Sequence, residues 1–322
     1  MEPTIVGIDI AKKKFDVALL LGEKTKSGAF HNTPAGFAIF ARWLTRQHGV
    51  ERIHACMEAT GTYGEELALY LHRAGHVVSV VNPAKIKGFA QSELSRTKTD
   101  KADAALIARF CRAMKPEAWQ PPAPEVKELQ SLVRRLESLN DMLTQERNRL
   151  PITEGMVRSS IERTISHLET EIQTTRHLIR EHIDQDPDLR SRRDLLESIP
   201  GIGPATSAMI LAEFGDVARF GDARRMASFC GLTPRHRQSG SSVRGKSMLS
   251  KTGSARIRKA LYMPALSAIR YNPVIAAFRA RLLANGKPRM VIVAAIMRKL
   301  VHIIFGVLKS GRRFDAAIAA AA

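Results

Sequence analysis

Four acidic residues stand in settings where a lone charge is hard to explain. Asp9 lies inside an apolar run and Glu58 ends a second one. Asp100 and Asp103 are three residues apart at the start of a predicted helix, so they share one face. Burying an unpaired carboxylate is costly, and carboxylate-rich clusters select Mg²⁺ or Mn²⁺. The four acids therefore predict a divalent-metal site, which could assist attack on a phosphodiester.

Each of these acids also has a plainer interpretation. Asp100 alone could belong to a helix cap with Thr99, and Glu58 alone could be a charge at a strand end. A purely structural role is hardest to defend for Asp9, because burial of its charge needs compensation. Asp16 is expected on a solvated face, since it belongs to a predicted hairpin strand.

A second group of residues is basic and rich in hydroxyls. The segment 234–246 is expected to be flexible, and it carries Ser239, Ser241 and Ser242 among arginines. A serine needs a base, a metal or nearby cations to become a nucleophile, and arginines can stabilise a phosphoryl transition state. By itself this composition more often indicates a phosphate-binding loop. It does not identify which serine reacts.

Two glycines separate two predicted helices further upstream. Gly201 and Gly203 follow Ile199-Pro200, a pattern typical of a helix-hairpin-helix. Its turn and the next helix N-terminus offer N–H groups to a phosphate, although a helix-turn-helix without a ligand remains an alternative. The predicted nucleic-acid contacts are Gly201, Gly203, Arg235, Arg237, Arg244, Lys246 and Lys251.

The elements that must position the acids alternate between strand and helix. Expected strands are 4–10, 15–21, a third strand that closes at 29–32, 52–58 and 77–81. Expected helices are 34–47, 63–74, 84–90 and 101–114. This order is that of an α/β domain of the ribonuclease H-like class. In such a domain the first and fourth strands are neighbours and the last helix packs over them, so the four acids should converge.

The rest of the chain is predicted to be mostly helical. A proline-rich linker at 120–124 precedes two long helices with coiled-coil-like leucine and isoleucine spacing and a break near Pro151. A basic helical segment follows from about residue 190. We therefore expect three domains, at 1–118, 119–189 and 190–322.

The overall charge points to a polyanionic partner. Lys and Arg number 50 against 31 Asp and Glu in 322 residues, a net charge of +19. Such a field attracts nucleic acid, although a charge that serves only solubility is the alternative.

The three cysteines lack zinc-site spacing, and no signal peptide is expected. The apolar stretch 291–308 is interrupted by Arg298, Lys299 and His302, which favours a buried helix over a membrane span. We expect a cytoplasmic, nucleoid-associated protein with no membrane partner.

Several motifs together resemble one family, the DEDD insertion-sequence transposases, which are related to the Piv DNA invertases and are known as bridge-RNA-guided recombinases. The motifs are 7–9 (GID), 58–61 (EATG), 98–103 (KTDKAD), 199–203 (IPGIG), 231–234 (GLTP) and 238–240 (QSG). The resemblance implies a RuvC-like N-terminal domain, a coiled-coil linker and a C-terminal serine transposase domain.

The same resemblance implies roles for individual residues. The metal-binding tetrad falls on Asp9, Glu58, Asp100 and Asp103, and the catalytic serine falls on Ser239, with Ser241 and Ser242 as adjacent rivals. Mg²⁺, or Mn²⁺, would assist the attack of Ser239 on DNA, giving a phosphoserine link before strand exchange and religation. That link conserves the phosphodiester energy, so no ATP is needed and no P-loop is expected.

The implied partners are donor and target double-stranded DNA, a structured guide RNA, and further copies of the chain as dimers that form a tetramer. Two rival functions remain open. One is a hydrolytic RuvC-like nuclease of the junction-resolvase type, and the other is a non-catalytic nucleic-acid-binding scaffold.

Overall fold

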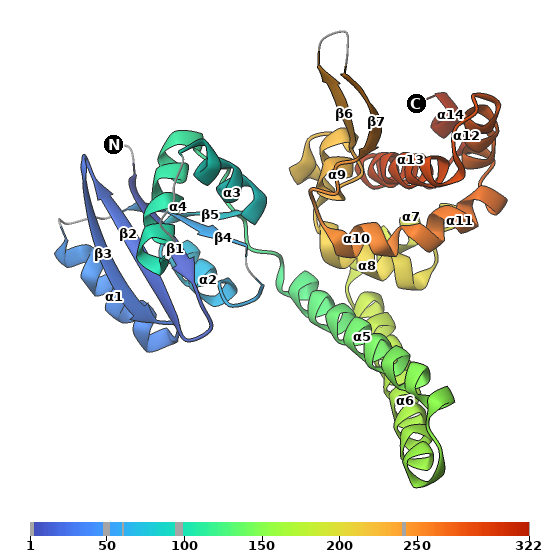
Figure 1. The fold of residues 1–322 in the computed structure, drawn as a ribbon, viewed down its shortest axis with the longest axis horizontal. Helices are drawn as coiled ribbons and strands as arrows, with labels where there is room; N and C mark the ends of the chain where they lie inside the picture. Colours follow the sequence, from blue (N-terminus) through green and yellow to red (C-terminus); the bar gives the residue numbers. More distant parts are fainter. Residues whose placement is uncertain (1–2, 48–51, 60, 94–98, 240–242, 322) are drawn as a thin grey trace. The chain divides into compact units, whose positions relative to one another are not determined.

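The computed structural model describes residues 3–47, 52–59, 61–93, 99–239 and 243–321, with the side chains of 236–247 and 319–321 left undescribed. The chain divides into two compact units, Met1–Pro121 and Pro122–Ala322. Figure 1 shows the elements of both units.

The N-terminal unit is built on a five-stranded mixed sheet in the order β3-β2-β1-β4-β5. Its strands are β1 (Thr4–Ile10), β2 (Lys14–Leu21), β3 (Lys24–His31), β4 (Ile53–Glu58) and β5 (Val77–Val81). β1, β2 and β3 pair antiparallel, whereas β1, β4 and β5 pair parallel. The predicted order of elements and the predicted neighbours β1 and β4 are confirmed. β3 ends at His31, within the range where a third strand was expected to close, and its first four residues are exposed.

Helices cover both faces of this sheet (Figure 1). They are α1 (Pro34–Arg46), α2 (Glu65–Arg73), α3 (Pro83–Ser92) and α4 (Asp100–Met114). α1 and α2 bury aromatic and aliphatic side chains such as Phe40 and Leu71 against one face. α3 and α4 cover the other face, where Ile86 and Ile107 pack beside Cys56. Two layers of helix therefore exclude water from both sides of β1 and β4.

The approach of α4 to the sheet is unusually close. A Cβ atom at Gly7 would lie 2.2 Å from the carbonyl oxygen of Ala104 and 2.3 Å from the backbone nitrogen of Ala108. Ala18, from the neighbouring strand β2, packs with the same two helical alanines. Small side chains on both elements thus set the distance between α4 and the strands beneath it.

The C-terminal unit is mostly helical. Its elements are α5 (Pro124–Arg149), η1 (Leu150–Ile152), α6 (Gly155–Gln185), α7 (Pro187–Glu197), α8 (Pro204–Phe214), η2 (Val217–Phe220), α9 (Ala223–Phe229), β6 (Pro234–Ser239), β7 (Val243–Leu249), α10 (Ala255–Ala260), α11 (Tyr262–Tyr271), α12 (Pro273–Ala284), α13 (Arg289–Ser310) and α14 (Ala316–Ala321). The two long helices α5 and α6 pack on each other through Leu139, Leu143, Leu168 and Ile172, and the break expected near Pro151 is η1.

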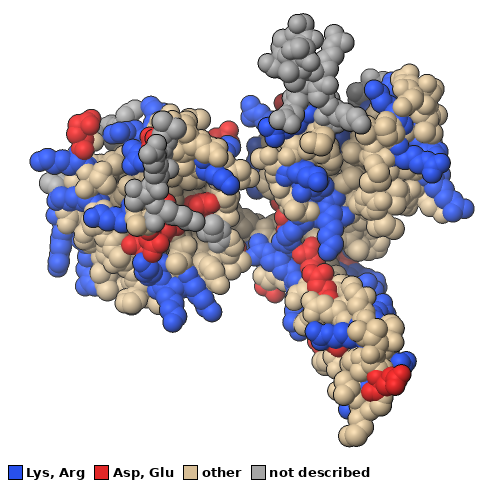
Figure 2. Space-filling view, in the orientation of Figure 1, with Lys and Arg blue, Asp and Glu red and all other residues tan. Residues whose placement is uncertain are grey.

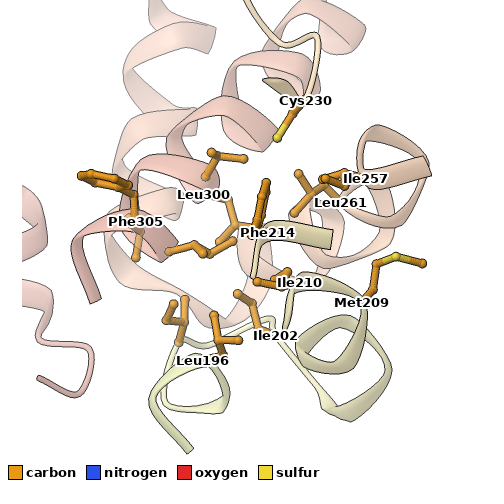
Figure 3. Close-up of a cluster of buried hydrophobic side chains, with 14 of the residues drawn as sticks. Leu196, Ile202, Met209, Ile210, Phe214, Cys230, Ile257, Leu261, Leu300 and Phe305 are labelled. Carbon is orange, nitrogen blue, oxygen red and sulfur yellow. The ribbon is translucent and has the colours of Figure 1, made fainter. Parts of the chain in front are cut away.

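The core of this unit gathers helices from its whole length. Phe214 of α8, Cys230, Leu261 and Leu300 of α13 are buried in one cluster (Figure 3). Leu129 and Val133 of α5 and Ile179 and Ile183 of α6 join the same cluster. The base of the long helical pair is therefore part of the C-terminal core, while its far end has a small core of its own.

Among the described residues one helix, α13, is long and apolar enough to cross a membrane by length and composition. Half of that window is buried inside the protein, with Ile296, Leu300, Val301 and Ile304 in the core. The buried helix predicted at 291–308 is thus present, and protein covers its most apolar face.

The segment expected to be a flexible loop has regular structure instead. β6 and β7 form a two-stranded antiparallel sheet with a register irregularity between Arg235 and Arg237. The sequence of these two strands carries none of the apolar alternation by which strands are usually predicted.

Candidate metal centre and nucleic-acid interface

The alternation of side chains along three strands puts three carboxylates on one face of the sheet. Successive strand residues point to opposite faces. Asp9 therefore shares the face of Gly7, which lies against α4, and Glu58 shares the face of Cys56, which packs beside the same helix. Asp16 pairs directly with Asp9 across β1 and β2. All three acids belong to the α4 side of the sheet.

The helix α4 brings two more acids to this place. Its N-terminus is capped by Thr99, whose side-chain oxygen accepts a hydrogen bond from the Ala102 backbone N–H at 3.2 Å. Asp100 and Asp103 fall in the first turn, where negative charge is favourable near the helix N-terminus. The cap expected at Thr99 is present, and it fixes the start of the helix that carries both acids.

The charges of these carboxylates act on one another, as their pKa values show. Burial raises the pKa of Asp9 to about 6, with further increases from the charges of Asp103, Asp100, Asp16 and Glu58. Burial and the charge of Asp103 also raise the pKa of Glu58. The sequence-predicted tetrad is therefore one electrostatically coupled group around Asp9.

A lysine that the sequence reasoning did not single out lies in this group. The Nζ of Lys14 donates a hydrogen bond to Asp100 Oδ2 at 2.8 Å and pairs with Asp16 Oδ2 at 3.0 Å. The hydrogen bond from Lys14 lowers the pKa of Asp100. Only pairing across strands and packing of α4 bring these three residues together, so spacing along the chain offered no signal.

The expectation for Asp16 was wrong. Its side chain is only 16% exposed and is held by Lys14, because the β1–β2 register sets it opposite Asp9 rather than toward solvent. A fifth carboxylate thus borders the predicted tetrad.

The donor set fits a divalent cation in its chemistry. All the candidate ligands are carboxylate oxygens, which Mg²⁺ and Mn²⁺ prefer, and their mutual repulsion at Asp9 is relieved by positive charge. Within the described parts of the chain, however, no three His, Cys, Asp or Glu side chains lie together as a group able to hold a metal ion. The carboxylates are gathered but not arranged as a preformed site.

The C-terminal unit holds the predicted nucleic-acid contacts. Ser239 is the last residue of β6, and its rivals Ser241 and Ser242 lie outside the described residues. Arg235 is exposed on β6, and the backbone places Arg237 on the same strand. The backbone also places Arg244 and Lys246 on β7, and Lys251 is exposed just after that strand. The structure thus groups these residues on and beside one hairpin.

One motif within the hairpin contradicts an expectation. Residues 240–247 (GSSVRGKS) have the spacing of a P-loop, which was not expected. In a P-loop the lysine stands where a strand gives way to a helix, whereas Lys246 lies inside strand β7. The context needed for a nucleotide site is missing among the described elements, and the match is one of spacing alone.

The two glycines between α7 and α8 differ in what they require. Gly201 has φ of +104°, and a Cβ there would lie 2.8 Å from the Ala268 backbone nitrogen. Gly203 precedes α8 as its N-cap residue, and a Cβ there would meet nothing within 4 Å. Gly201 is therefore needed for packing, whereas Gly203 leaves the start of α8 open.

A large groove lies beside the hairpin. It has a volume of ≈ 1220 Å³, and its lining is mainly apolar, from Met248, Tyr262 and Val291 among others. Its basic members are Lys251, Arg258, Lys259, Arg298, Lys299 and His302. Figure 2 shows Lys and Arg spread over both units and a patch of Asp and Glu on the N-terminal unit.

Comparison with known proteins gives two family matches, and the first of them crosses the boundary between the two units after Pro121. Residues 6–152 match a DEDD transposase domain, described as Transposase, of an RNase H-like class that generally uses divalent metal ions. Residues 193–280 match the model described as Transposase IS116/IS110/IS902 family.

The relatives below align with nearly the whole chain. The pilin gene-inverting protein of Moraxella bovis is 38% identical over 318 residues, 98% of each chain, and that of Moraxella lacunata is 37% identical over the same share. A putative transposase of Sinorhizobium fredii is 24% identical over 362 residues, 96% of this chain and 89% of the relative. The chain therefore belongs to the IS116/IS110/IS902 family of transposases, and it is a DNA recombination enzyme.

Proposed function

We propose that the chain is an RNA-guided DNA recombinase in which Ser239 attacks a DNA phosphodiester with the help of Mg²⁺ or Mn²⁺. The observation that carries the metal part is the carboxylate group around Asp9, whose pKa is raised to about 6 by burial first and then by the charges of the neighbouring acids. In this proposal Asp9, Glu58, Asp100 and Asp103 hold the metal. When bound, the ion supplies positive charge for the reacting phosphate and the leaving oxygen.

The serine step is proposed from the basic hairpin. The Ser239 Oγ forms a bond to phosphorus while the bond from phosphorus to the 3′ oxygen breaks, leaving a phosphoserine link and a free 3′ hydroxyl. Arg235, Arg237, Arg244, Lys246 and Lys251 hold the phosphates around it. Reversal of this step rejoins strands, and the relatives named as gene-inverting proteins support a reaction that ends in religation.

A structured guide RNA pairs with donor and target DNA, and two dimers form the active tetramer. Gly201 and Gly203 form a helix-hairpin-helix, in which the open start of α8 receives a phosphate. The working domains are 1–118, a coiled-coil linker at 119–189, and 190–322. A cytoplasmic, nucleoid-associated location follows from acting on DNA.

The test is a covalent-trapping assay. The full chain would be incubated with Mg²⁺, labelled donor and target DNA and the RNA transcribed from its own element, then resolved on a denaturing gel. We expect a protein–DNA adduct in the wild type that is lost in both Ser239→Ala and Asp9→Asn. Ser241→Ala and Ser242→Ala are the matched controls, and each should keep the adduct.

Other outcomes separate the rival functions. Cut ends without an adduct, unaffected by Ser239→Ala, would leave a hydrolytic nuclease. An adduct that is lost only in Ser241→Ala or Ser242→Ala would move the nucleophile to that residue. Binding without any cleavage in the presence of Mg²⁺ and RNA would favour a non-catalytic scaffold.

A further inference from the structure

The backbone holds Lys14 at the edge of the carboxylate group. It opens strand β2, and by the strand period it shares the face of Asp16 and Ala18, the face covered by α4. The backbone N–H of Ala11 donates to its carbonyl oxygen at 2.9 Å and closes the turn between β1 and β2. The root of the side chain is thus fixed at the rim of the carboxylate group.

The ammonium of Lys14 bridges two carboxylates from different elements. Asp100 begins α4 and Asp16 lies on β2, and the ammonium reaches Oδ2 of both, at 2.8 and 3.0 Å. Lys14 and Asp100 are 48% and 58% exposed, and pairs of such exposure contribute little to stability. Anchoring the fold is therefore a weak reason for the contact between Lys14 and Asp100.

The Lys14–Asp100 pair has a larger effect on cation binding at the site than on the stability of the fold. One oxygen of Asp100, a candidate metal ligand, is already taken by the ammonium, and a divalent ion on that carboxylate would stand beside a like charge. Charges separated by a few ångströms repel strongly even near a protein surface. Asp16 is far less exposed than Asp100, so it is the partner better placed to keep the ammonium close.

We propose that Lys14 is a built-in counter-cation of the carboxylate group, which holds Asp100 in the metal-free protein and competes with the divalent ion for it. Asp16 is the positioning residue that retains the displaced ammonium at the rim. This inference rests on the metal site of the proposed function, and it goes beyond that function by making metal affinity adjustable through a residue that is not a ligand.

The test is a Mn²⁺ titration of the full chain, followed by calorimetry and by the electron spin resonance signal of free Mn²⁺. Lys14→Gln should bind Mn²⁺ roughly fivefold to tenfold more tightly than the wild type, because one like charge is removed. Lys13→Gln removes an exposed charge from the same turn and should change the affinity less than about twofold, since screening weakens distant charges. Lys14→Met, which keeps the aliphatic stem, is the second variant and should behave like Lys14→Gln.

A second readout checks the competition directly. The rise in melting temperature on adding Mn²⁺ should be larger for Lys14→Gln than for Lys13→Gln. An affinity for Lys14→Gln and Lys14→Met that equals that of Lys13→Gln, or falls below it, would overturn the inference while leaving the metal site intact. Absence of Mn²⁺ binding in the wild type would overturn both, and Asp9→Asn, which should bind Mn²⁺ weakly, shows that the measured site is the proposed one.

Discussion

At the scale of single residues, acids crowd one end of the N-terminal sheet. The charges of Asp103, Asp100, Asp16 and Glu58 all act on Asp9, in addition to its burial. A protein under selection for stability alone would gain by replacing some of them. Such local costs persist where function requires them, and the cost here agrees with a group that awaits a cation.

The raised pKa of Asp9 gives a prediction with a definite sign. The folded state holds the proton up to about pH 6, whereas the ordinary value is 3.8. Between these values the folded state binds more protons than the unfolded one, so stability falls as pH rises through this window. Without divalent ions, Asp9→Asn should therefore melt at a higher temperature than the wild type at neutral pH.

Thermal unfolding in a chelator across pH checks this sign. The advantage of Asp9→Asn should shrink as the pH falls from about 6 toward about 4, where the wild-type carboxyl is itself protonated. A wild type that is equally stable or more stable than Asp9→Asn at neutral pH would contradict the origin we assign to the raised pKa.

At the scale of elements, the contact between β1 and α4 determines where the acids lie. Asp9 is two residues after Gly7 on the strand, and Asp103 immediately precedes Ala104 on the helix. The same close contact that seats α4 therefore sets the distance between the acids of the strand and those of the helix. Packing and site geometry are coupled through one glycine.

Gly7→Ala tests this coupling. The added Cβ would lie 2.2 Å from a backbone carbonyl oxygen of α4, so the helix must move away from the sheet. Overpacking of this kind costs roughly 1–3 kcal/mol or more, and we expect that loss in chemical denaturation together with weaker Mn²⁺ binding.

Gly88→Ala serves as its control. Gly88 lies within α3, and a Cβ there would meet nothing within 4 Å. Alanine in a helix is favoured over glycine by about 0.5–1 kcal/mol, so this variant should be as stable as the wild type or more so. Equal stability of Gly7→Ala and Gly88→Ala would show that α4 is not held at this distance.

At the scale of the whole molecule, charge is the property that both units share. The net charge of +19 is spread over both units in Figure 2 rather than confined to one helix. A field of this kind attracts the nucleic-acid backbone and releases its counterions. The affinity of the full chain for nucleic acid should therefore depend steeply on salt.

Fluorescence anisotropy with labelled duplex DNA measures this dependence. If the protein makes six or more phosphate contacts, raising the salt concentration from about 50 to about 200 mM should weaken DNA binding by about 10³-fold or more. Arg235→Gln and Lys251→Gln should each make the slope less steep by about one. A slope near zero would mean that the basic surface serves solubility and not binding.

The sequence by itself was enough to predict the order of elements in the N-terminal unit. Apolar periodicity and turn residues are local properties, and they placed β1, β4 and α4 within a few residues of their observed bounds. Local motifs likewise pointed to Asp9, Glu58, Asp100 and Asp103, because each acid sits where burial or a helix start makes it conspicuous.

Only the tertiary structure decided what surrounds those acids. The place of Asp16 depends on the β1–β2 register, and the contacts of Lys14 depend on the packing of α4 across β2. Neither feature can be predicted from the spacing of residues along the chain. The strands β6 and β7 were missed because their sequences show no apolar alternation, whereas the backbone pairing that forms them involves residues apart in the chain. These features depend on contacts between segments that are distant in sequence. Such contacts form only in the folded chain, so local sequence patterns do not reveal them.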